Sequence, residues 1–268
     1  MPRIAVGVEY EGSAYAGWQS QPTAPSVQEQ CERALARVAA APVALVCAGR
    51  TDAGVHALGQ VAHFDTDAER SMRSWVLGAN SELPGDISLC FAQVVPAHFH
   101  ARYSAESRTY RYLIHNRGAR SALWARRAAW VHRPLDTQRM VEAAAHLTGE
   151  HDFSAFRAAE CQAKSPVRRL QRLEVSRAGE LVSIEVTANA FLHHMVRNLA
   201  GLLIAIGKGD AEPSWAAEVL AGRDRTRSAA TAPAAGLYFA AVRYPDAFGL
   251  PRAPGGGQPP DRLSSPDL

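Results

Sequence analysis

The chain has 268 residues, of which 47% are hydrophobic and 21% are charged, so it can bury one or two ordinary cores. Its formal net charge of +3, from 29 basic and 26 acidic residues, is too small to indicate nucleic acid binding by itself. The N-terminus leads directly into a strand-like pattern rather than a signal peptide, and the longest apolar stretch, 199–206, is too short to cross a bilayer. The sequence therefore predicts a cytoplasmic protein without a membrane partner.

The first half of the chain alternates strand and helix signals. Residues 4–10 have period-two hydrophobicity, which is typical of a half-buried strand. After a loop rich in Gly, Ser and Pro, Ser26 and Glu29 form an S-x-x-E capping box that predicts a helix start, and Pro42 ends that helix near residue 41. The remaining expected elements are strands at 43–48, 59–65 and 87–95 and a helix at 71–80.

The second half repeats this order of elements. A strand at 107–115 places Tyr110 and Tyr112 on one face, and a helix is expected to start at Asp136. Further strands are expected at 167–176, 181–188 and 237–244, and further helices at 190–207 and 213–221. Each half therefore follows the order strand, helix, strand, strand, helix, strand, which is that of a ferredoxin-like or RRM-like α/β sandwich.

The arginines are unevenly distributed. Only Lys164 and Lys208 are lysines, so 27 of the 29 basic residues are arginines. From Arg102 to Arg133 there are eight arginines and one acidic residue, Glu106. Such a strip is expected to attract phosphate, although a solvated basic face would have the same composition.

The segment whose residue types are best suited to catalysis lies at 48–56, between two expected strands, and reads Ala-Gly-Arg-Thr-Asp-Ala-Gly-Val-His. Its glycines allow a tight turn and the close approach of a ligand. Asp52 could be presented from the edge of the sheet for catalysis, or it could cap its own loop in an Asx-turn. The spacing alone does not choose between these interpretations.

Five motifs, in order along the chain, resemble those of the tRNA pseudouridine synthase A family. The segment 49–56 resembles the family signature, whose Asp is the catalytic residue. The other motifs lie at 9–21, at 99–112, at 189–198 (Asn-Ala-Phe-Leu-His-His-Met-Val-Arg-Asn) and at 231–237. The resemblance extends from about Ile4 to Pro251. Glu11, Ala230 and Phe239 depart from the usual family residues, but none of them stands at an expected catalytic group.

The resemblance implies an α/β (α+β) fold with two pseudosymmetric RRM-like halves. Their sheets are expected to be antiparallel, with helices on one side and the catalytic cleft between the halves. We expect an N-terminal domain at 1–104 and a C-terminal domain at 105–248. The segment 249–268 is rich in Pro, Gly and Ser without an apolar period, and we expect it to be a disordered tail.

The resemblance also implies the reaction and the residues that perform it. Asp52 is expected to be the catalytic carboxylate, as a nucleophile or as a general base, and Arg197 to be its cationic partner. Tyr110 is expected to stack on the target base and to help move the C5 proton, and Arg50 to enter the RNA helix as the uridine leaves it. The implied partners are the anticodon stem-loop of tRNA, at positions 38, 39 and 40, and a second copy of the chain in a homodimer.

No cofactor or metal is expected. The isomerisation needs no redox change or group donor, and the chain has no P-loop or Rossmann glycine fingerprint. His193 and His194 are expected to point in different directions from a helix, without a carboxylate or cysteine at ligand spacing.

Two alternatives to this function remain. A non-catalytic RNA-binding protein would need the arginines and tyrosines but not Asp52. The same chemistry could also act on uridines elsewhere in tRNA or in another RNA, because phosphate contacts do not read sequence.

Overall fold

The structure, a computed structural model, describes residues 1–251 of the chain. In the first half it contains β1 (Arg3–Tyr10), α1 (Val27–Ala39), β2 (Val46–Cys47), β3 (His56–Asp65), α2 (Met72–Glu82) and β4 (Ile87–Val95). The second half contains β5 (Ser107–Asn116), β6 (Ala129–Val131), α3 (Thr137–Ala145), β7 (Gly149–Asp152), β8 (Val167–Ala178), β9 (Leu181–Ala188), α4 (Met195–Gly207), α5 (Trp215–Gly222) and β10 (Leu237–Arg243). Every helix and strand expected from the sequence is present.

The main differences from the expected elements have local causes. The helix expected at 190–207 begins only at Met195, because His194 adopts a left-handed backbone conformation (φ 60°) that cannot continue a helix. The strand expected at 43–48 is reduced to β2, and the short strands β6 and β7 were not expected. The predicted helix start after Ser26 is confirmed, since the Ser26 hydroxyl accepts a hydrogen bond from the Glu29 N–H (3.3 Å).

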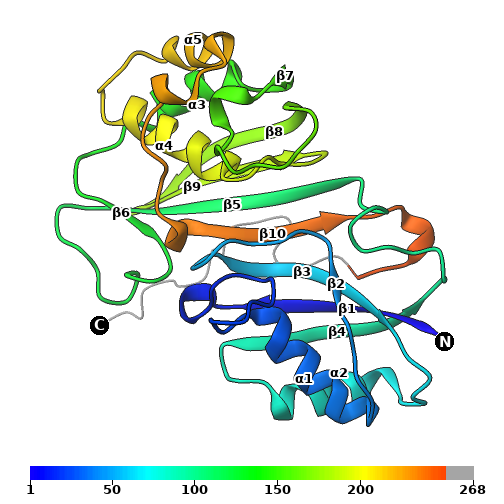
Figure 1. Cartoon of the computed structure of the whole chain (residues 1–268). Coiled ribbons are helices and arrows are strands. Elements are labelled where there is room, and N and C mark those ends of the chain that lie inside the picture. Colours follow the sequence, from blue (N-terminus) through cyan, green and yellow to red (C-terminus); the bar gives the residue numbers. More distant parts are fainter. Residues whose placement is uncertain (252–268) are drawn as a thin grey trace.

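All strands belong to one mostly antiparallel sheet (Figure 1). Its order is β4-β1-β3-β10-β5-β9-β8-β7, with β2 beside β3 and β6 beside β5. The order β4-β1-β3-β2 in the first half matches β10-β5-β9-β8 in the second, as expected for two ferredoxin-like halves. The halves join where β3 and β10 run parallel, through the pairs His56–Tyr238 and Ala57–Phe239.

The helices of both halves cover the same face of this sheet. Strand pairing runs from Tyr10 through Ala57, Phe239 and Tyr110 to Val186, and directly paired residues share a face. Tyr10 and Phe239 pack in a first core with α1 and α2, and Val186 packs in a second core with α3, α4 and α5. Figure 1 shows these two groups of helices at opposite ends of the sheet. The α/β fold expected from the sequence is therefore confirmed.

The two cores exchange a few residues across the seam between the halves. The first core is built from β1, β3, β4, α1 and α2 but also includes Phe239 and Tyr244. The second core is built from β5, β8, β9 and α3 to α5 but also includes Val55. Each core thus receives side chains from the other half, which holds the halves in register.

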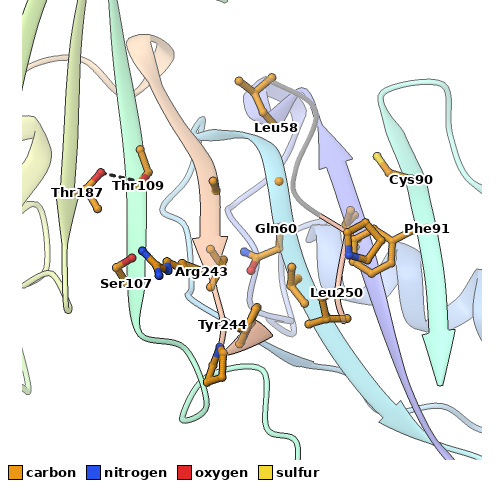
Figure 2. A pocket seen from close by; sticks show the side chains of 18 of the residues that line it. Leu58, Gln60, Cys90, Phe91, Ser107, Thr109, Thr187, Arg243, Tyr244 and Leu250 are labelled. Carbon is orange, nitrogen blue, oxygen red and sulfur yellow. Dashed lines mark hydrogen bonds between the residues drawn. The ribbon is translucent and has the colours of Figure 1, made fainter. Parts of the chain in front are cut away.

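The opposite face of the sheet has a cavity of about 640 Å³ (Figure 2). It is lined by residues of seven strands and by the segment 244–251, and within the described residues no α-helix contributes to it. Thr109 and Thr187, which share a hydrogen bond of 2.9 Å there, alternate along their strands with Tyr110 and Val186, which face the helices. This cavity is therefore separated by the sheet from the face that carries the helices.

The tail expected at 249–268 is described only in part. Leu250 packs against the first core, so the first residues of this segment are held by the protein. The remainder, 252–268, lies outside the described residues. Among residues 1–251, no helix combines the length and apolar character needed to cross a membrane.

Candidate active site

Asp52 lies in a loop between β2 and β3 that several backbone contacts hold in place. The Thr51 carbonyl accepts a hydrogen bond from the Trp18 N–H (3.0 Å), and the Thr51 hydroxyl is 2.8 Å from the hydroxyl of the buried Tyr10. Gly17 has φ of 97°, and a Cβ there would lie 2.3 Å from the Thr51 carbonyl oxygen. Only glycine permits this approach of the two loops. The backbone beside Asp52 is therefore fixed before any ligand binds.

Arg108 connects this loop to the segment that precedes α4. Its guanidinium donates to the Ala48 carbonyl (3.2 Å) and to the Asn189 carbonyl (3.1 Å). Gln60 Nε2 donates to the Gly49 carbonyl at 2.7 Å, which completes the base of the loop. The sequence did not single out Arg108, because a cation that binds backbone carbonyls has no short sequence signature.

Arg197 approaches Asp52 from α4. Its Nε donates to the Ala232 carbonyl (2.8 Å), and its own carbonyl accepts from the Ala232 N–H (3.1 Å). One turn further along α4, Gly201 lies so close to the Ala230 carbonyl that a Cβ would be 2.1 Å from its oxygen. With its Nε held in this way, the guanidinium places Nη1 3.9 Å from Asp52 Oδ2. The structure thus brings together two residues that are 145 positions apart in the sequence.

His193 and His194 also surround Asp52, which corrects the expected geometry. His193 Nε2 lies 3.4 Å from Asp52 Oδ1, and His194 Nε2 lies 3.3 Å from Oδ2. The two rings are 4.0 Å apart between centroids. The expectation that they point apart assumed a helix at this position, but the left-handed turn at His194 places both imidazoles against the same carboxylate. The carboxylate within ligand distance of the histidines is that of Asp52, which lies in the loop between β2 and β3 and is far from them in the sequence.

The Asp52 carboxylate is accessible, with its side chain 33% exposed, whereas Arg197 is 17% exposed. Burial lowers the pKa of His194 below its ordinary value, and the Asp52 charge opposes this effect only in part. The site therefore combines a reachable carboxylate, a guanidinium that is always charged, and an imidazole that is biased towards its neutral form.

An aromatic cleft of about 560 Å³ lies beside this carboxylate, on the face of the sheet that carries the helices. The ring of Tyr110 meets Phe191 and Phe239 edge to face, with centroids 4.9 and 5.0 Å away. All three line the cleft. The pKa of Tyr110 is raised by burial first and by the nearby Asp52 charge second, so its hydroxyl keeps its proton at neutral pH.

Phe191 lies in the range 190–207 that was expected to be a helix, but it precedes α4 and forms a wall of the cleft. Arg50 is exposed and lines the same cleft, as do Arg102 and Arg108. Arg50 and Tyr110 are therefore positioned on one cavity next to Asp52, although the larger cavity on the opposite face includes none of the expected site residues.

The arginine strip is not a continuous phosphate surface. Arg111 is 4% exposed and pairs with Glu185 at 2.9 Å. Arg117 and Arg133 form ion pairs with Glu180 and Asp210. With Arg108, half of the eight arginines therefore have structural partners within the chain. The other four, Arg102, Arg120, Arg126 and Arg127, are exposed.

An aromatic cleft and exposed arginines next to a held carboxylate are the features expected of an RNA-modifying enzyme of the α/β class. Comparison with known proteins agrees with this class. A family model described as tRNA pseudouridine synthase matches residues 6–104 and 143–245. A tRNA pseudouridine synthase A of Methylococcus capsulatus is 57% identical over 250 residues, covering 93% of this chain and 92% of the relative.

Two further relatives with the same name are of similar closeness. The Pseudomonas aeruginosa protein is 55% identical, covering 93% of this chain and 88% of its own length. A Coxiella burnetii protein is 54% identical, covering 95% of this chain and 97% of its own. The chain belongs to the tRNA pseudouridine synthase family, whose members are isomerases.

Proposed function

We propose that this enzyme converts uridine to pseudouridine at positions 38, 39 and 40 in the anticodon stem-loop of tRNA, with Asp52 as the catalytic carboxylate and without a cofactor. The observation that supports the role of Asp52 most directly is its position. An accessible carboxylate stands 3.9 Å from the guanidinium of Arg197 and beside the cleft lined by Tyr110 and Arg50.

The reaction breaks the bond from uracil N1 to ribose C1′, turns the base, and joins C5 to C1′. The proton released from C5 is balanced by the proton gained at N1, so product and substrate are isomers. Asp52 acts on the ribose, either by attack on a carbon centre or by removal of a ribose proton. Both routes need the ionised carboxylate, and Arg197 favours that form when bound RNA displaces water from the site.

The cleft binds the extruded base. Tyr110 offers its ring for stacking and its protonated hydroxyl for a hydrogen bond, and Phe191 and Phe239 hold that ring in place by edge-to-face contacts. Arg50 at the rim replaces the uridine inside the RNA helix. A base that leaves the stack costs a few kcal/mol, and these contacts offset that cost.

We further propose two domains, 1–104 and 105–248, that work in a cytoplasmic homodimer. Two separate cores support the division into domains. A second copy would add its own exposed arginines, among them Arg102, Arg120, Arg126 and Arg127, to the basic surface that holds tRNA.

The proposed substrate is tested by mapping pseudouridine in bulk tRNA from cells with and without the gene. We expect the loss to be confined to positions 38, 39 and 40, and restored by the wild-type gene. Loss at uridines in another stem, or in another RNA, would contradict the proposed target and leave the family chemistry in place.

A further inference from the structure

The cluster of Asp52, His193 and His194 has the donor set of a site for a borderline divalent cation. One carboxylate oxygen from Asp52 and one ring nitrogen from each histidine lie within 4.8 Å of one another. Neutral imidazole and carboxylate are standard zinc ligands, and three protein ligands with an open fourth position are typical of accessible zinc sites.

Each histidine nitrogen lies from one Asp52 oxygen at about the spacing of two ligands around a tetrahedral ion. Zinc lies about 2.0–2.1 Å from nitrogen and oxygen ligands, which places two ligands of a tetrahedron about 3.3 Å apart. His193 Nε2 is 3.4 Å and His194 Nε2 is 3.3 Å from the carboxylate oxygens of Asp52. The side chains of Asp52 and His193 are each 33% exposed and that of His194 is 30% exposed, so a hydrated ion can reach them.

We propose that Zn²⁺ binds to Asp52, His193 and His194 and thereby inhibits the enzyme. The inhibitory part rests on the proposed role of Asp52, because a metal bound to the carboxylate occupies the oxygen that must act on the ribose. The binding part does not depend on that role. No bond to substrate is formed or broken by the ion, which acts only by occupying the ligands.

The positive charge of Arg197 weakens the binding of a cation at Asp52. Its guanidinium is 3.9 Å from Asp52 Oδ2 and is held by the Ala232 carbonyl, so its charge opposes a divalent cation on the same carboxylate. Replacing it with a neutral residue should strengthen zinc binding, by roughly tenfold for a partly solvated charge at this distance.

A competing ligand lies nearby. Cys161 Sγ accepts a hydrogen bond from the His193 N–H at 3.4 Å, and Cys90 is exposed. Thiolates bind zinc strongly, so the experiment must separate these sulfurs from the proposed ligands.

The test measures binding of ZnCl₂ to the full chain after chelator treatment, by calorimetry, with CoCl₂ as a spectroscopic probe. We expect one ion per chain, at least tenfold weaker binding in His193→Gln and His194→Asn, and tighter binding in Arg197→Gln. Asn is chosen at 194 because it tolerates the left-handed backbone there. His132→Gln, at an exposed position, is the matched control and should bind as the wild type does.

The cobalt spectrum identifies the ligands of the ion, and melting curves show whether the variants are folded. Absence of binding, unchanged affinity in both properly folded histidine variants, or a thiolate charge-transfer band that disappears in Cys161→Ser would each overturn the site. Pseudouridine formation by the wild type should fall with added ZnCl₂ and return with EDTA. Binding without inhibition would overturn the inhibitory role, whereas an enzyme inactive even without zinc would count against the proposed function and not against the metal site.

Discussion

At the residue scale, the environment of Asp52 is set by side chains from both halves of the protein. The loop 48–56 supplies the carboxylate, and the segment 193–197 supplies two imidazoles and a guanidinium. The charge on Arg197 is permanent, whereas the pKa of His194 is lowered by burial. The dominant fixed charge facing the carboxylate is therefore that of Arg197.

Tyr110 offers a test that separates its ring from its hydroxyl. Tyr110→Phe keeps the edge-to-face contacts with Phe191 and Phe239 and removes only the oxygen. We expect tRNA affinity to stay within a few-fold and single-turnover pseudouridine formation to slow by about 10²–10⁴-fold, the usual loss when a proton-transfer group is removed.

The matched control is Tyr103→Phe, since Tyr103 lines the same cleft but is 75% exposed. Its rate should be close to that of the wild type. Equal rates in Tyr110→Phe and Tyr103→Phe would mean that Tyr110 contributes its ring alone.

At the element scale, α4 positions Arg197 through its close packing against residues 230–232. Gly201 permits this packing, because a Cβ there would meet the Ala230 carbonyl oxygen at 2.1 Å. Gly201→Ala must push α4 and this segment apart. We expect a loss of stability of about 1–3 kcal/mol in denaturant unfolding, together with a larger fall in turnover than in tRNA affinity.

Gly85→Ala is the control for this change, since an added Cβ at Gly85 meets nothing within 4 Å. It should alter stability by no more than about 0.5 kcal/mol. If Gly201→Ala were as stable and as active as Gly85→Ala, the packing of α4 would not be what places Arg197.

At the scale of the whole molecule, His56 holds the seam between the halves. Its Nδ1 accepts from the Gly12 N–H (3.0 Å), so Nε2 carries the proton and donates to the Ala235 carbonyl (3.1 Å). Its ring stacks on Tyr238 of β10 at 4.6 Å. This last residue of the signature 49–56 therefore connects the loop of Asp52 to the segment that holds Arg197.

Removal of the ring should loosen this connection. His56→Ala leaves a buried N–H and a part-buried carbonyl without their partner, at a cost of up to about 1–3 kcal/mol each, and we expect unfolding at lower denaturant concentration with reduced turnover. His132→Ala, at an exposed position, should change stability by no more than about 0.5 kcal/mol. Equal stability of the two variants would contradict the role of His56 in the seam.

The same histidine predicts a pH dependence of stability. Burial lowers the pKa of His56 in the folded protein, although the Glu11 charge opposes this effect. The unfolded chain therefore binds a proton near pH 6.5 that the folded chain does not bind, so His56 makes stability fall as the pH drops below about 6.5. Unfolding curves measured from pH 7.5 to 5.5 should show a smaller loss in His56→Ala. An unchanged slope would mean that His56 is not held neutral.

Most of the fold could be predicted from local signals, because alternating hydrophobicity, the Ser26 cap and Pro42 act within one element. The pairing of β3 with β10 could not, since it joins residues more than 180 positions apart. At the site, Asp52, Arg197, Tyr110 and Arg50 followed from motifs.

The histidine pair did not follow from the motifs, because its geometry depends on a left-handed residue that periodicity does not reveal. That the arginine strip attracts phosphate stays a prediction. Composition does not show which guanidinium groups are used inside the protein, as Arg111 is with Glu185.

The catalytic role of Asp52 is the central claim, and Asp52→Asn tests it most directly. The amide keeps the size of the side chain and removes the charge, so tRNA affinity should stay within a few-fold of the wild type. Pseudouridine formation at positions 38–40 of purified tRNA should fall by about three orders of magnitude or more. Turnover near that of the wild type, with folding and tRNA binding intact, would contradict the account.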